Sequence, residues 1–362
     1  MPASSPVRLS LAMVAWDDAD VIGRALISAA PVCDELVVID AGSADRTVEL
    51  ASRYGATVHD LAWENDFSAL RNAAFDLCTG DWILWLDPDE VVPPESRPVL
   101  ADLRPQLNDD VDVVFCPQHG RIGDGGSPSL TFARERLVRR AAAVRWEGRA
   151  YERIAAPPER AGLHRDLVIE HRPGPDRETR DLERRAAILA DWPADERPPE
   201  TLFFLGNDLM YHGRFGEAAD TYAEYLAVES DGEHRYWALV SRAECLFVFD
   251  EPEAGRQALL EAVGADSSRA EAFVTLGRLH ADAEQWDEAV PLFLAATAAS
   301  RPKFGFAREA DYAYAPWDYL TICYEKLGRF AEALSAAERS LLAGNPEAHR
   351  VRANMHLMVD RL

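Results

Sequence analysis

Three carboxylates lie within four positions, at Asp87, Asp89 and Glu90, directly after the apolar run Trp82–Leu86. Such a run is typical of a strand that is buried on both faces and cannot carry acids in its interior. The acids therefore belong at the carboxyl end of that strand, which is the edge where open α/β sheets bind ligands. An Asp-x-Asp pair there can direct two oxygens at Mg²⁺ or Mn²⁺, and the ion can bridge to phosphate oxygens.

The elements before this strand predict a sheet that positions the acids. Apolar runs at Arg8–Val14, Leu36–Asp40 and Thr57–His59 indicate three more strands, and helical stretches separate them. Alternation of strands and helices favours a largely parallel sheet that is covered by helices on both faces. The second strand, like the acidic one, ends in an acid, Asp40.

Four segments in this region resemble a known family in their order and spacing: Ser10–Val14, Val37–Thr47, Asn65–Asn72 and Gly80–Glu90. They resemble the N-terminal half of family 2 glycosyltransferases with the GT-A fold, in a subgroup that joins the catalytic domain to tetratricopeptide repeats. The architecture is similar to that of the sublancin-type peptide S-glycosyltransferases. One departure is Ala15–Asp18, which stands where the family usually has a Lys-Asn-Glu-Glu-like run.

The resemblance implies roles for four residues. Asp40 would accept a hydrogen bond from the base of a nucleotide, and Arg71 would lie near the nucleotide, where a guanidinium suits phosphate or carbonyl oxygens. Asp87 would contact the ribose or a metal-bound water, and Asp89 would bind the metal directly. The structural alternatives are that Asp40 only ends a strand and that Arg71 is a surface residue of a helix.

A catalytic base is expected in the segment Val144–Ile154. Glu152 matches the position where GT-A enzymes place the acid that deprotonates the acceptor, although the family's His-Glu is Tyr-Glu here. An inverting transfer needs a base opposite the leaving nucleotide, because the acceptor attacks in line. Glu147 is the rival base, and a salt bridge from Glu152 to Arg149 or Arg153 is the structural alternative.

Two further features follow the acidic strand. Val168–His171 resembles the end of the GT-A domain, where a histidine returns to the metal or the pyrophosphate, so His171 is a candidate metal ligand. Neutral imidazole can ligate Mn²⁺, and its cation can bind phosphate. The Gly-rich stretch His119–Ser129 is either a mobile lid over the donor or a hairpin connection.

The C-terminal half predicts a helical repeat array. Small anchor residues at Ala218, Ala254, Ala289 and Ala333 are spaced by 36, 35 and 44 positions, close to the tetratricopeptide period of about 34. The long last spacing indicates an insert at 301–316. We therefore predict an α/β GT-A (Rossmann-like) nucleotide-sugar domain at 1–172, a linker and connecting helix at 173–199, and all-α tetratricopeptide-like repeats at 200–362, ending in a capping helix.

Composition limits the partners and the compartment. The chain has 362 residues and a net charge of −24, from 38 Lys and Arg against 62 Asp and Glu. A nucleic-acid partner favours a basic footprint, so it is not expected. No apolar run reaches eighteen residues and no signal pattern opens the chain, so we expect a cytoplasmic protein without a membrane span. The five cysteines have no metal-binding spacing, and four of them are expected to be buried thiols.

Together these features predict a metal-dependent, inverting glycosyltransferase that uses Mg²⁺ or Mn²⁺ and a nucleotide sugar, with UDP as the expected nucleotide. The expected acceptor is a peptide or protein, because repeats bind extended chains on a concave surface. A cell-surface glycan or a small molecule is the alternative acceptor. The alternative from another class is a repeat scaffold with a degenerate transferase domain. The repeats could also support a homo-oligomer.

Overall fold

The computed structural model describes residues 6–120, 130–154, 157–174, 177–229, 233–302, 305–359 and 361. The chain divides into two compact units: the first comprises residues 1–121 and 132–198, and the second comprises residues 122–131 and 199–362. The Gly-rich residues 121–129, for which a lid or a hairpin connection is predicted, lie outside the described residues. The helix predicted to connect the two halves, α5 (Arg177–Asp191), belongs to the first unit.

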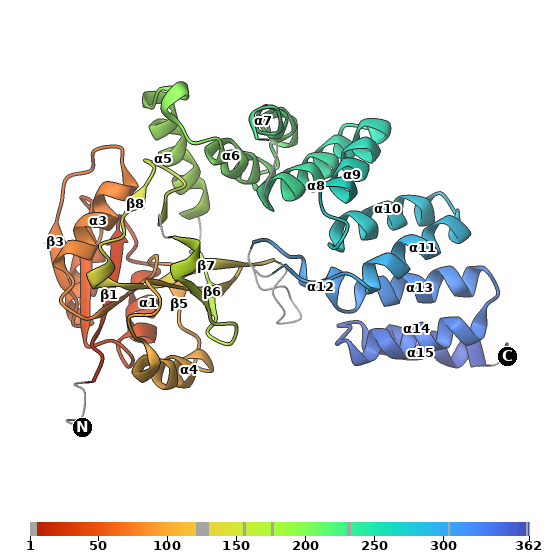
Figure 1. Cartoon of the computed structure of the whole chain (residues 1–362), viewed down its shortest axis with the longest axis horizontal. Helices are drawn as coiled ribbons and strands as arrows, with labels where there is room; N and C mark the ends of the chain where they lie inside the picture. Colours follow the sequence, from red (N-terminus) through yellow and green to blue (C-terminus); the bar gives the residue numbers. More distant parts are fainter. Residues whose placement is uncertain are drawn as a thin grey trace. The chain divides into compact units, whose positions relative to one another are not determined.

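A mixed sheet forms the centre of the first unit, in the strand order β3-β2-β1-β4-β7-β6-β11-β5, with β10 beside β6 (Figure 1). β1 is parallel to β2 and β4, and β2 is parallel to β3, as the alternation of strands and helices predicts. β7 and β5 instead run antiparallel to β4 and β11, so the sheet becomes mixed after the acidic strand. The strands are β1 Leu9–Ala15, β2 Glu35–Asp40, β3 Thr57–Asp60, β4 Trp82–Trp85, β5 Glu90–Val91, β6 Val113–His119, β7 Thr131–Arg139, β10 Ala161–Leu163 and β11 Ile169–His171, with β8 Trp146–Glu147 and β9 Arg153–Ile154 as a separate antiparallel pair.

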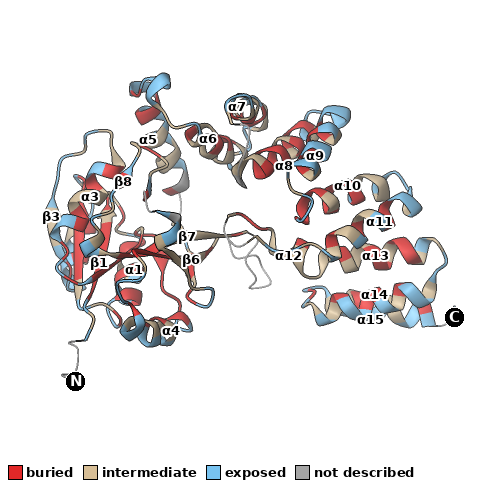
Figure 2. Ribbon diagram, viewed as in Figure 1, coloured by how far each residue is buried: buried red, intermediate tan, exposed pale blue. Residues whose placement is uncertain are grey.

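Helices cover both faces of this sheet. Successive strand residues point to opposite faces, and accordingly Leu84 packs in the cluster that contains α1, whereas Trp85 packs in the cluster that contains α3. The central strands β1, β2 and β4 are almost entirely buried, and Figure 2 shows red ribbon in the interior of this unit. The helices of this unit are α1 Ile22–Ala29, α2 Thr47–Arg53, α3 Phe67–Leu77, α4 Ser96–Leu103 and α5. Alternate apolar residues of a strand thus pack against helices on opposite faces of the sheet.

A fully buried ion pair lies beside the acidic strand. The Arg136 guanidinium on β7 donates to both carboxylate oxygens of Glu90, at 2.5 and 2.6 Å, and also to Gln118 at 2.8 Å. The side chains of Arg136 and Glu90 are 0% and 2% exposed. Removing one partner of such a pair leaves the other charge buried and uncompensated, which is strongly destabilising.

We therefore expect Arg136→Met to lower the free energy of unfolding by about 3–5 kcal/mol. Urea titration followed by tryptophan fluorescence measures this loss. Arg46→Met is the matched control, because Arg46 pairs with Glu49 on the surface, where screening by solvent leaves an ion pair with little effect on stability. Equal losses in the two variants would contradict a stabilising role for the buried pair.

The second unit is a series of antiparallel helix pairs (Figure 1). Its helices are α6 Glu200–Tyr211, α7 Phe215–Val228, α8 Glu233–Val248, α9 Pro252–Ala265, α10 Glu271–Asp282, α11 Trp286–Thr297, α12 Glu309–Tyr312, α13 Ala315–Lys326, α14 Phe330–Leu342 and α15 Ala348–Val359. The short helix α12 lies within the predicted insert. The C-terminal helix α15 packs on α14, as predicted for a capping helix. The repeat architecture is therefore confirmed.

One anchor of the repeat pattern is wrong by one residue. Ala254 is exposed, whereas Gly255 is buried. A Cβ at Gly255 would lie 2.5 Å from the ring of Phe247, so the close approach of α8 and α9 requires glycine there. Anchors at 218, 255, 289 and 333 give spacings of 37, 34 and 44. A small residue identifies the helix contact only when it also faces the neighbouring helix.

The remaining predictions about composition can be checked in the same structure. All five cysteines carry free thiols, and four of them, Cys78, Cys116, Cys245 and Cys323, are buried. Burial raises the pKa of the Cys116 thiol to about 12, so it stays protonated at neutral pH. Within the described part of the chain, no helix has the length and apolar character needed to cross a membrane.

Candidate active site

The predicted site residues gather where β2 and β4 end. Asp40 is the last residue of β2, and Asp87 and Asp89 follow β4 by two and four residues. β2 and β4 both run parallel to β1, so their carboxyl ends meet at one edge of the sheet. Two groups of contacts form there. One is centred on Arg71, and the other is centred on Asp89.

Arg71 joins two carboxylates that are far apart in the sequence. Its guanidinium on α3 donates to Asp87 at 2.8 Å and to Glu152 at 2.6 Å. Burial acts to lower the pKa of Arg71, but the two carboxylates outweigh it and raise the pKa. Burial likewise acts to raise the pKa of Asp87, and Arg71 with its neighbours outweighs this, so that the pKa of Asp87 is lowered. Arg71 and Asp87 are therefore charged at neutral pH, and Arg71 is not a surface residue.

Glu152 is held close to the acidic edge, and Glu147 is not. The side chain of Glu152 is 9% exposed, whereas Glu147 lies exposed on β8. The ion pair of Glu152 is with Arg71, not with Arg149 or Arg153 as the structural alternative supposed. The preceding residue, Tyr151, has a φ of 55°, a left-handed conformation that is unfavourable for a bulky residue and is often found at functional sites. This turn directs Glu152 back towards Arg71.

Asp40 lies in the turn that follows β2. Its Oδ2 accepts hydrogen bonds from the backbone N–H groups of Gly42 and Ser43, at 3.1 and 2.9 Å. Its Oδ1 is buried and has no hydrogen-bond partner among the described residues. A buried acceptor without a partner costs free energy unless a ligand satisfies it. The geometry therefore leaves one oxygen of Asp40 available to a donor group such as an N–H of a nucleotide base.

Asp89 has two cationic or potentially cationic neighbours. The Nε2 atom of His171 on β11 lies 3.0 Å from Oδ2 of Asp89. The Nε atom of Arg177, at the start of α5, lies 2.8 Å from the same oxygen, and Arg177 also pairs with Asp18. Burial raises the pKa of Asp89 although His171 opposes this, and burial lowers the pKa of Arg177 to about 10. A buried carboxylate and a partly exposed imidazole thus meet near the end of β4.

These two side chains fit a divalent cation as a partial ligand set. Carboxylate oxygen and imidazole nitrogen are both ligands of Mn²⁺, and a hard cation can take its remaining ligands from phosphate and water. No three His, Cys, Asp or Glu side chains cluster as a ready metal site in the part of the chain that the structure describes. Among the described residues Asp89 and His171 are therefore only part of a ligand set, and Arg177 contacts the Asp89 oxygen that a cation would use.

Arg177 and Asp18 are contacts that the sequence pattern missed. Arg177 stands in the Arg- and Glu-rich helix, where a run of charges normally indicates a solvated face. Arg180 and Arg184 of the same helix donate to the backbone carbonyls of Asp17 and Trp16, at 2.7 and 3.1 Å. The signal available was the position of Asp17 and Asp18 directly after β1, at the same carboxyl edge. α5 therefore contacts the loop that follows β1, which is the segment where this chain departs from the family's usual sequence.

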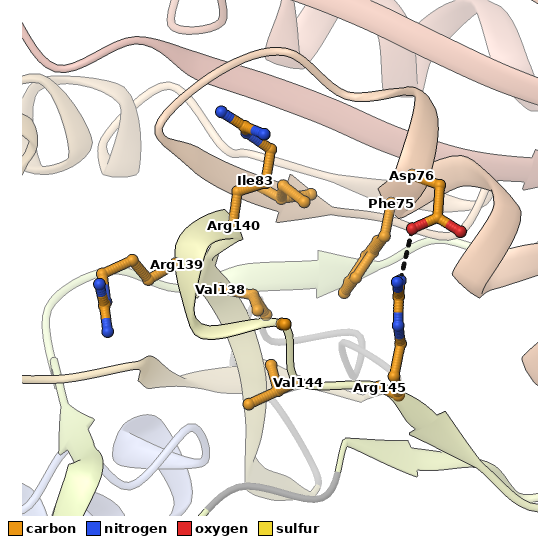
Figure 3. A pocket seen from close by; sticks show the side chains of 9 residues that line it. Phe75, Asp76, Ile83, Val138, Arg139, Arg140, Val144 and Arg145 are labelled. Carbon is orange, nitrogen blue, oxygen red and sulfur yellow. Dashed lines mark ion pairs between the residues drawn. The ribbon is translucent and has the colours of Figure 1, made fainter.

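A small pocket lies away from this edge. It has a volume of about 150 Å³ and opens beside Ile83 of β4 and Val138 of β7 (Figure 3). Its arginines already have partners: Arg139 and Arg145 pair with Asp112 and Asp76, and Arg140 donates to the carbonyl of Gly80. The pocket contains none of the predicted site residues.

Comparison with known proteins assigns the first unit. Residues 10–167 match the family model described as glycosyl transferase family 2. The chain carries a family 2 glycosyltransferase domain. The matched segment includes Asp40, Arg71, Asp87, Asp89 and Glu152, and it ends shortly before His171. The family predicted from the motifs is thus confirmed for this domain, which is joined here to tetratricopeptide repeats.

Three curated relatives are similar to this chain over about 30% of its length. A TPR repeat-containing protein of Synechococcus elongatus is 42% identical over 30% of this chain and 26% of its own length. An uncharacterized glycosyltransferase of Rickettsia felis is 31% identical over 30% of this chain and 34% of its own. The glycosyltransferase SunS of Bacillus subtilis is 25% identical over 30% of this chain and 26% of its own. The chain thus matches only about a quarter to a third of the length of these relatives.

Proposed function

We propose that this protein transfers a sugar from a nucleotide sugar, UDP-linked, to an acceptor with inversion at the anomeric carbon. The observation that carries the proposal is the chain of contacts Asp87–Arg71–Glu152, because it brings a donor-site acid and a base from distant segments to one edge of the sheet. The family 2 domain supports the reaction class. The side chains of Arg71 and Glu152 are only 11% and 9% exposed, and that of Asp87 is 26% exposed.

The donor would bind across the ends of β2 and β4. Oδ1 of Asp40 would accept a hydrogen bond from the nucleotide base, and Asp87 would contact the ribose. Arg71 would lie near the nucleotide. It would also hold Asp87 and Glu152 in place, because its guanidinium forms ion pairs with both carboxylates. These contacts would fix the anomeric carbon of the sugar between the diphosphate and the catalytic base, Glu152.

Glu152 would act as the catalytic base. It would take the proton from the acceptor nucleophile as the nucleophile bonds to the anomeric carbon and the bond from that carbon to the diphosphate oxygen breaks. UDP would leave on the opposite face, which inverts the configuration. The hydrogen bond from Arg71 keeps Glu152 oriented, and the low exposure of Glu152 limits the access of water to it.

Asp89 and His171 would hold Mn²⁺ or Mg²⁺. The ion, when bound, would neutralise the charge that develops on the departing diphosphate. Asp89 and His171 are adjacent at the end of the sheet, and Arg177 would have to yield the oxygen of Asp89 that it now contacts. Asp18 and Asp181 remain as partners for Arg177.

We propose that the repeats select the acceptor. Helical repeats commonly bind extended chains, which favours a peptide or protein acceptor over a glycan or a small molecule, and they could also bring two copies of the chain together. The proposed domain limits are 1–172 for the catalytic domain, 173–199 for the connection and 200–362 for the repeats. A cytoplasmic location agrees with the free cysteine thiols.

A screen of nucleotides and nucleotide sugars tests the donor assignment. A ligand that binds only the folded protein raises its melting temperature. We expect UDP and one or more UDP-sugars to do so in the presence of Mn²⁺, and we expect slow hydrolysis of the preferred donor. Absence of any shift and of any hydrolysis across the panel would favour the alternative, a repeat scaffold with a degenerate transferase domain.

Asp40→Ala should weaken UDP binding more than it slows transfer at saturating donor. Its carboxylate would contact the base, far from the bond that breaks, so the lost interaction affects ground and transition states alike. We expect an increase in Kd of about 10-fold, the scale of a hydrogen bond to a charged group. Calorimetry with UDP and Mn²⁺ measures it, with Asp45→Ala in the neighbouring turn as the control. An unchanged Kd would remove Asp40 from the site.

A further inference from the structure

Three guanidinium groups surround the indole ring of Trp85, the last residue of the acidic strand. The guanidinium carbons of Arg136, Arg134 and Arg71 lie 4.0, 4.9 and 5.0 Å from the ring centroid. Cations are attracted to the face of an aromatic ring, but they also repel one another. Such a cluster is stable only when carboxylates or other anions balance it.

Two of the three arginines have carboxylate partners. Arg71 pairs with Asp87 and Glu152, and Arg136 pairs with Glu90. Arg134 has neither an ion pair nor a hydrogen bond with any residue that the structure describes, although it is half-buried. Burial lowers the pKa of Arg134, yet an arginine remains protonated at neutral pH. The carboxylates of Glu135, Glu90 and Asp87 act on Arg134 through space and oppose this lowering. None of them forms an ion pair with it, so among the described residues the N–H groups of Arg134 are left for an anion to contact directly.

The strand register places Arg134 beside the candidate active site. β7 is antiparallel to β4, with Leu84 opposite Leu137 and Ile83 opposite Val138. Because the strands are antiparallel, residues that precede Leu137 on β7 lie opposite residues that follow Leu84. Continued in this register, Arg134 lies beyond the end of β4, close to Asp87. Arg134 and Arg136 are two residues apart in one strand, so both point to the face that carries Trp85. This is the face on which Arg71 contacts Glu152.

We propose that Arg134 binds an anionic group, a phosphate or a carboxylate, of the acceptor. The inference rests on the proposed function, in which the acceptor must approach Glu152. A guanidinium presents several N–H donors in a planar fork that matches both kinds of anion. The chain has a net charge of −24, so an anionic acceptor is repelled at long range and needs a local cation such as Arg134 to be held at the site.

Binding of phenyl phosphate is the direct test, with phenol as the neutral probe. Calorimetry on the full-length protein, saturated with UDP and Mn²⁺, should show that phenyl phosphate binds and that phenol does not. Arg134→Gln should weaken the binding of phenyl phosphate at least about 10-fold, the scale of a charge-assisted hydrogen bond. Arg134→Lys keeps the charge but loses the planar fork of N–H donors. Its affinity for phenyl phosphate should lie between that of the original protein and that of Arg134→Gln. Circular dichroism of each variant verifies folding.

Arg145→Gln is the matched control, because Arg145 is half exposed and lines the pocket of Figure 3, where it pairs with Asp76. It should bind phenyl phosphate like the original protein. Equal loss in Arg145→Gln would place the anion in that pocket and overturn the proposal. Equal binding of phenyl phosphate by the original protein and by Arg134→Gln would also overturn it.

The donor is the other possible source of an anion, and UDP affinity separates the two. If Arg134 serves the acceptor, Arg134→Gln should leave the Kd of UDP within about twofold. A loss of UDP affinity with uridine affinity unchanged would assign Arg134 to the donor diphosphate and contradict the proposal. Failure of the original protein to bind UDP or any UDP-sugar would instead contradict the proposed function, whereas normal UDP binding without phenyl phosphate binding would contradict only this inference.

Discussion

Asp89→Asn should abolish sugar transfer and remove most of the Mn²⁺-dependent binding of the donor. An amide oxygen carries no net charge and is a weak ligand for a hard cation. Even residues that only orient a metal ligand contribute about 10- to 100-fold to metal affinity, so loss of a direct ligand should exceed that range. Asp89 is also one of the carboxylates that neutralise Arg177. In Asp89→Asn the charge of Arg177 would still be paired with Asp18.

Donor hydrolysis across a Mn²⁺ titration measures this effect, together with direct Mn²⁺ binding by electron paramagnetic resonance. Asp81→Asn is a suitable control, since Asp81 lies at the opposite end of the same strand and accepts a hydrogen bond from the backbone of Arg8. Full activity of Asp89→Asn at low Mn²⁺ would remove Asp89 from the metal site. Loss of activity with unchanged Mn²⁺ affinity would indicate that Asp89 acts through Arg177 and His171 instead.

Glu152→Gln should leave donor binding nearly normal and slow transfer by about 10²-fold or more, the usual contribution of a general base. The amide preserves the shape of the side chain, and its carbonyl oxygen can still accept the hydrogen bond from Arg71. It cannot accept a proton from the acceptor. Arg71 keeps its contact with Asp87 at 2.8 Å, so the donor side of the site should stay intact.

Single-turnover transfer and UDP calorimetry on the same samples separate chemistry from binding. Glu147→Gln is the control, because Glu147 lies exposed on β8 without a contact to Arg71. A crippled Glu147→Gln beside an active Glu152→Gln would reverse the assignment of the base. If Glu152→Gln instead weakens UDP binding as strongly as it slows transfer, Glu152 serves to hold Arg71 rather than to accept the proton.

Local patterns in the sequence determined the elements of the fold. The apolar run before Asp87 became the buried strand β4, and the connecting helix predicted within 173–199 is α5, Arg177–Asp191. The small anchors of the repeats predicted helix pairs, since one face of each helix must approach its partner closely. Such patterns depend on residues a few positions apart, so they are visible without the tertiary structure. They also placed the acids at the carboxyl edge of the sheet.

The tertiary structure alone decided which charged side chains meet. Arg71 contacts Glu152 across 81 positions in the chain, and Arg177 contacts Asp89 across 88. Arg134 lies beside Trp85 because β7 returns antiparallel along β4, and no local period encodes that register. Gly255 rather than Ala254 contacts Phe247 for a related reason. Residue spacing predicts which side chains share a face, but contacts across elements depend on strand register and helix orientation, which arise only when the whole core packs.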